Sequence, residues 1–153
     1  MTISHLMAHM KFNAKGHDAV SAQGVIPKLP ALFDPTGVAV SIDVGGAIVS
    51  FMLDSHGRGK AANGMFALTL KPTKRNPKTK KLDFLGGDVK FKANLRNGNW
   101  SGAWSNDGVD PARTAKNQPL TLTVNLTFLN QPYTATVTAM YTGVAGKSGR
   151  FSK

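Results

Sequence analysis

The chain has 153 residues, enough for one domain, because folding at this length removes about two-thirds of the unfolded surface from water. It carries 19 Lys and Arg against 8 acidic residues, all Asp, so its net charge is +11 and we expect attraction to anionic partners. The absence of cysteine excludes disulfides, thiolate metal sites and a cysteine nucleophile, and no apolar stretch approaches the ~18 residues of a membrane span.

The first ten residues differ from the rest of the chain. Residues 1–10 contain three Met and two His and lack the basic start and apolar block of a signal peptide. This composition is typical of a vector-derived leader, so we expect the folded part to be one all-β domain, residues 11–153.

The first clear strand pattern follows a loop-rich stretch. Val38, Val40, Ile42 and Val44 alternate with small or polar residues, the signature of a strand with one buried face, and Gly45-Gly46 predicts a tight hairpin turn. Further strands are predicted over 66–70 and, once or twice, within 82–95.

A basic segment interrupts the strand patterns. Residues 71–81 read KPTKRNPKTKK, which neither composition nor charge suits to packing, so we interpret them as a linker. The run either grips anions or is a solvated linker that keeps the chain soluble. Its candidate anion-binding residues are Lys71, Lys74, Arg75, Lys78, Lys80 and Lys81.

The loop over residues 97–118 holds both tryptophans. Trp100 and Trp104 would share one face of a strand, where exposed indoles beside Asn99 and Asp107 could hold a sugar ring. The alternative is that both indoles plug the end of the core, with each N–H bonded to a loop carbonyl.

Two more alternating strands are predicted near the C-terminus, over 120–128 and 133–141, with a turn at 130–132. Their polar positions form threonine rows, which would make a flat hydroxyl-and-methyl face. Such rows resemble those of ice-binding proteins, but they are also an ordinary solvent face of paired strands: Thr121, Thr123 and Thr127 beside Thr134, Thr136 and Thr138.

Two halves of the chain share anchors in the same order. Lys-Phe-Asn-Ala at 11–14 recurs as Lys-Phe-Lys-Ala at 90–93, and the Gly-x-Phe at 64–66 recurs at 149–151. We interpret residues 11–70 and 82–153 as two repeats of one unit joined by the linker 71–81. The predicted fold is an antiparallel β-sandwich or closed barrel with pseudo-symmetric repeats.

The hairpin FMLDSHGRGK at 51–60 fits the pattern F-x-L-D-x-x-G-x-G-K. It resembles duplicated β modules of very large secreted or surface-attached bacterial proteins. The resemblance implies an extracellular or cell-surface, non-enzymatic part of a larger assembly, and the missing signal sequence would then mark a cut segment. A cytoplasmic location stays an alternative.

No catalytic or metal-binding constellation emerges. The neighbours Asp54, Ser55 and His56 hold the letters of a catalytic triad, but adjacent residues in one hairpin do not adopt its geometry, and no pair of acids stands out for glycoside hydrolysis. We therefore expect no enzyme, no metal and no cofactor.

Two functions are left. The first is a structural or adhesive β module of a secreted or surface protein, and the alternative is a binding domain for an acidic polymer, either polysaccharide or nucleic acid. Unpaired edge strands would add the possibility of self-association.

Overall fold

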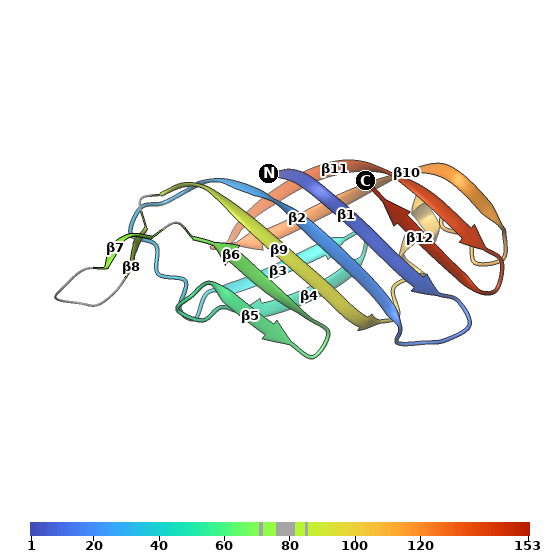
Figure 1. Ribbon diagram of the computed structural model, residues 1–153, viewed down its shortest axis with the longest axis horizontal. Helices are drawn as coiled ribbons and strands as arrows, with labels where there is room; N and C mark the ends of the chain where they lie inside the picture. Colours follow the sequence, from blue (N-terminus) through green and yellow to red (C-terminus); the bar gives the residue numbers. More distant parts are fainter. Residues whose placement is uncertain (71, 76–81, 85) are drawn as a thin grey trace.

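The computed structural model describes residues 1–70, 72–75, 82–84 and 86–153, with the backbone alone for 72–75 and 82–84. Ten strands form one antiparallel sheet, in the order β4-β3-β10-β11-β12-β1-β2-β9-β6-β5, that curls into a nearly closed barrel (Figure 1). The ten strands are β1 (Thr2–Lys11), β2 (Asp18–Leu29), β3 (Ala39–Val44), β4 (Ala47–Met52), β5 (Arg58–Ala61), β6 (Gly64–Thr69), β9 (Gly87–Gly98), β10 (Ala115–Phe128), β11 (Gln131–Val144) and β12 (Ser148–Ser152).

A single bridge between Leu53 and Gly59 connects the two ends of the sheet, just beyond β4 and within β5. The remaining strands, β7 (Pro72–Arg75) and β8 (Leu82–Phe84), pair with each other in a separate two-stranded sheet. The described residues contain no α-helix, only the short 3-10 helix η1 (Ala103–Asp107). The all-β prediction is therefore confirmed, and the sheet is close to a barrel.

The barrel interior is filled by alternate side chains of every long strand. In β10 the inward residues between Leu120 and Phe128 are at most 1% exposed, while the threonines between them face outward. Aromatic rings pack across the interior: Phe66 stacks on Phe91 at 5.9 Å, and Phe33 meets Phe128 edge-on at 5.3 Å. This burial supplies the main stabilisation, at about 25 cal/mol per Å² of apolar surface removed from water.

Both predicted hairpins form, but the second turn lies earlier in the chain than predicted. Gly45 and Gly46 take positive φ angles of 56° and 97° between β3 and β4, as a primed two-residue turn requires. The second turn lies at Leu129 and Asn130, with φ of 52° and 58°, and β11 already begins at Gln131. The turn predicted at 130–132 was therefore placed about one residue too far along the chain.

The stretch between Ala14 and Val38, predicted to be loop-rich, contains the long strand β2. It pairs with β1 on one side and β9 on the other, and its inward residues include Val20, Ala22 and Ile26. The prediction of a loop was wrong there because β2 also places Ala19 and Val25 on its outward positions, which blurs the contrast between its faces.

Residues 1–10, set apart in the sequence as a leader, belong to the folded sheet. They form most of β1, which is hydrogen-bonded to both β12 and β2, and Ile3, Leu6 and Met10 are buried in the barrel. The folded domain therefore extends beyond the predicted range 11–153. Their origin as a vector-derived leader stays a prediction.

The later parts of the two interpreted repeats do not have the same strand count. Residues 39–69 form four strands, β3 to β6, whereas 115–152 form three, β10 to β12. The pseudo-symmetric repeats accordingly stay a prediction.

Candidate functional site

The hairpin with the F-x-L-D-x-x-G-x-G-K pattern is held by the carboxylate of Asp54. Its Oδ1 accepts the backbone N–H of His56 at 2.8 Å and of Arg58 at 2.9 Å, and Gly57 turns the chain with φ of 71°. The hydrogen bond from the Arg58 N–H, helped by that of His56 and by nearby positive charge, holds the pKa of Asp54 below its ordinary value against a smaller opposing effect of burial. The carboxylate of Asp54 thus stabilises the turn through two backbone N–H groups.

Gly59 allows this hairpin to close the barrel. A Cβ atom there would lie 2.7 Å from the Cβ of Phe51 and 3.1 Å from the carbonyl oxygen of Met52, so any other residue would push β5 away from the end of β4. The two glycines and the aspartate of the pattern therefore have structural roles, which leaves Lys60 as its outward-facing member.

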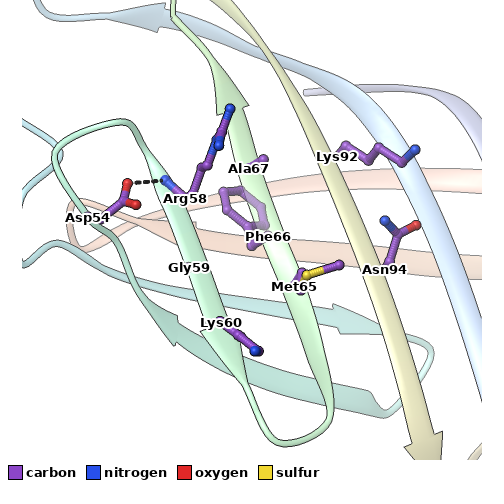
Figure 2. Close-up of a pocket in the computed structure, with 9 residues that line it drawn as sticks. All are labelled: Asp54, Arg58, Gly59, Lys60, Met65, Phe66, Ala67, Lys92 and Asn94. Atoms are coloured by element: carbon purple, nitrogen blue, oxygen red, sulfur yellow. Dashed lines mark hydrogen bonds between the residues drawn. The ribbon is translucent and has the colours of Figure 1, made fainter.

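A groove of about 250 Å³ crosses the outer surface of β5, β6 and β9 (Figure 2). The pairing register sets its residues in two cross-strand rows. We call it the basic groove and define it by those rows, Arg58–Ala67–Lys92 and Lys60–Met65–Asn94. The three cations are exposed, and one carboxylate, that of Asp54, also lines the groove and interacts electrostatically with Arg58.

A second groove of similar volume lies over β11, β12 and β1. It is lined by one cation, Arg150, together with His9, Met140 and polar side chains. Its walls offer less charge than those of the basic groove.

The tryptophans do not share one exposed face. The chain around them is η1 and its approach rather than a strand, and Trp104 is fully buried, with its indole N–H donating to the Val44 carbonyl at 2.8 Å and its ring edge-on to Phe151. Trp104 is therefore part of the core, with its indole N–H bonded to a backbone carbonyl, as in the alternative prediction. The half-buried Trp100 lies over Gly98, where its ring occupies the space that a Cβ would take.

The polar partners predicted for the tryptophans are separated from both grooves. Asn99 is exposed, and Asp107 lies at the end of η1 close to Gly45. Partial burial, together with the negative charge of Asp43, raises the pKa of Asp107. Neither residue lines either groove, and ligand binding by Trp100, Asn99 or Asp107 stays a prediction.

No sequence pattern indicates the role of Asp18, the buried charged residue of the described core. Its Oδ2 accepts the backbone N–H of Trp100 at 2.6 Å and of Ser101 at 2.8 Å, and Oδ1 accepts that of Lys11 at 3.1 Å. One carboxylate therefore ties the end of β1 to the loop after β9. No pattern links these residues along the chain, so only the fold reveals the contact.

Most of the predicted anion-binding residues lie outside the part of the chain that the structure describes. Lys71, Lys78, Lys80 and Lys81 lie outside the described residues, while the backbone of Lys74 and Arg75 belongs to β7, opposite Asp83 and Leu82.

The threonine rows lie on two paired strands. Thr121 pairs with Thr138 and Thr123 with Thr136 on the outer face of the barrel. Asn125 interrupts the first row, bonded to Thr134 and Asp43.

Within the described part of the chain, no group of three or more metal-ligating side chains occurs, and no helix is long and apolar enough to cross a membrane. No protein-family model matches the chain, and neither a curated protein nor a solved structure matches it.

Proposed function

We propose that this chain is a non-catalytic structural or adhesive β module of a secreted or surface-attached protein. The observation that carries the proposal is the filled barrel: the inward positions are apolar and packed, so the side chains open to a partner are on the outside. The one buried charged side chain in the described core, Asp18, is already bonded to three backbone N–H groups. Barrels that carry small ligands instead keep an internal cavity.

The extracellular location is part of the same proposal. Its support is the resemblance of 51–60 to hairpins of large secreted or surface bacterial proteins, together with the structural roles of Asp54, Gly57 and Gly59. The duplication of 11–70 and 82–153 is likewise proposed on the shared anchors. The strand β1, which ends at the start of the anchor 11–14, and β9, which contains the anchor 90–93, flank the same strand β2.

A second function, binding of an acidic polymer, is favoured by the basic groove. Three exposed cations lie there beside a single carboxylate, that of Asp54, and the whole chain has a net charge of +11. An adhesive module with such a surface would hold anionic material without changing it.

Both functions are tested together by incubating the protein with polygalacturonate. We expect the polymer to co-sediment with bead-bound protein at low salt, to be released as salt rises, and to show no new reducing ends. Chain cleavage would overturn the non-catalytic proposal, and polymer left in the supernatant at low salt would overturn acidic-polymer binding.

Self-association through the edges of β4 and β5 is proposed from their place at the two ends of the sheet, where a single bridge joins them. Sedimentation velocity should show a concentration-dependent dimer. A monomer throughout the micromolar range would contradict it.

A further inference from the structure

We propose that the basic groove is a binding site for the carboxylate groups of an extended acidic polysaccharide. This inference rests on the proposed acidic-polymer function and adds to it a site and a ligand class. It places binding on the barrel wall rather than in the basic segment 71–81 or the tryptophan loop.

Positive charge lies both across the basic groove and along β9. Arg58 and Lys92 stand on either side of Ala67, two strands apart and therefore about 10 Å from each other at the backbone. The small Ala67 side chain between them leaves the hollow open. Along β9 the outward positions continue the positive charge, with exposed Lys90 and Arg96 on either side of Lys92 and Asn94.

The positive charges of the basic groove do not converge on one point. Figure 2 shows the three cationic side chains diverging: Arg58 points toward one end of β6, Lys60 toward the other, and Lys92 over β2. A single small anion would require converging donors, as bidentate recognition does. A polymer with repeated charges can meet each cation in turn, so this arrangement fits an extended chain.

The lining of the basic groove favours a polysaccharide over a nucleic acid. Single-stranded nucleic acids are bound by aromatic rings on which bases stack, but the ring in this groove, that of Phe66, is buried beneath Gly59 and Ala67. The floor is instead formed by the exposed Met65 and the half-buried Asn94. The Asn94 Oδ1 accepts the Ser21 hydroxyl at 3.2 Å, and Figure 2 shows its amide nitrogen on the side of β6, where it can donate to a sugar hydroxyl.

The test compares three double variants that each change the net charge by the same amount. Lys60→Glu with Lys92→Glu alters the basic groove, Lys78→Glu with Lys80→Glu alters the basic segment, and Lys116→Glu with Lys147→Glu is the matched control on exposed positions elsewhere. Binding of polygalacturonate and of a poly-dT oligonucleotide is measured by fluorescence anisotropy at several salt concentrations.

We expect the groove variant to lose about tenfold or more in affinity for polygalacturonate, and the slope of log K against log salt to fall by about one for each cation removed. The other two variants should each change the affinity by less than about threefold. Unchanged thermal unfolding of all three would confirm that the barrel is intact.

Each other outcome has a distinct meaning. Equal losses in the groove and control variants would overturn the site while leaving acidic-polymer binding in place. Tighter binding of poly-dT, lost in the groove variant, would overturn the ligand class. If the wild-type protein binds neither polymer, the acidic-polymer function fails and the groove assignment fails with it.

Discussion

At the scale of single residues, the buried carboxylate of Asp18 accepts three backbone hydrogen bonds from two separate segments. Asp18→Ala would leave the backbone N–H groups of Lys11, Trp100 and Ser101 without their acceptor, and we expect a loss of about 3 kcal/mol in the free energy of unfolding. Asp18→Asn keeps one acceptor oxygen and should lose less.

Urea unfolding measures both variants beside Asp110→Ala. The side chain of Asp110 accepts one N–H in an exposed turn, so its removal should have a smaller effect. Equal effects at the two positions would contradict the role assigned to Asp18.

Asp107 gives a pH-dependent prediction. Because burial and the charge of Asp43 raise its pKa in the folded state, its ionised form destabilises the fold, with the full penalty above the folded pKa and none below the unfolded value near 3.8. Asp107→Asn should therefore raise the thermal midpoint at pH 7 and have little effect near pH 3. A variant that is less stable at pH 7 would show instead that the carboxylate is needed there.

The residue scale is also where the sequence was least informative. The spacing of Trp100 and Trp104 predicted a shared face only if the chain were extended, and η1 instead buries one indole and leaves the other against Gly98. The basic groove could not be predicted either, because Arg58 and Lys92 are brought together by the register of three strands and not by sequence proximity.

At the scale of elements, the close approach between β4 and β5 depends on Gly59. Gly59→Ala places a methyl group against Phe51 and the Met52 carbonyl, and we expect a destabilisation of about 1–3 kcal/mol. Gly102→Ala is the matched control, since nothing lies within 4 Å of a Cβ there. Thermal unfolding compares the two variants. Equal stability of Gly59→Ala and Gly102→Ala would contradict the role assigned to Gly59.

The strand β1 gives a second prediction at this scale. Deleting residues 1–10 removes Ile3, Leu6 and Met10 from the core, each worth about 1.5–3 kcal/mol, and exposes the edges of β2 and β12. We expect the shortened chain to lose its cooperative unfolding transition. In the full chain Leu6→Ala should cost about 2–5 kcal/mol, and a cooperative, equally stable deletion variant would show that β1 is dispensable.

How well each element could be predicted follows from the contrast between its two faces. In β3 and β10 large apolar residues alternate with Ser, Asp or Thr, so the period of two is plain. In β2 the inward Ala22 and Gly24 are small and the outward Val25 is apolar, so the same period is hidden. The strand β1 was not predicted, because its Met and His composition suggested a leader, although its inward positions suit a strand.

At the scale of the whole molecule, the interior of the barrel provides stability and its outer surface is available for interaction. Its apolar residues fill the interior, while exposed cations on β5 and β9 are set on a rigid wall whose register fixes their spacing. Such a surface can hold a charged polymer without any moving part, which is the behaviour expected of an adhesive module.

The most direct test of this account is a ¹⁵N NMR titration of the whole chain with a hexamer of galacturonic acid. We expect chemical-shift changes to concentrate on the backbone amides of Arg58, Lys60, Met65 and Lys92, and to disappear at high salt. Changes centred on Trp100 or on residues 71–81, or no change at all, would contradict it.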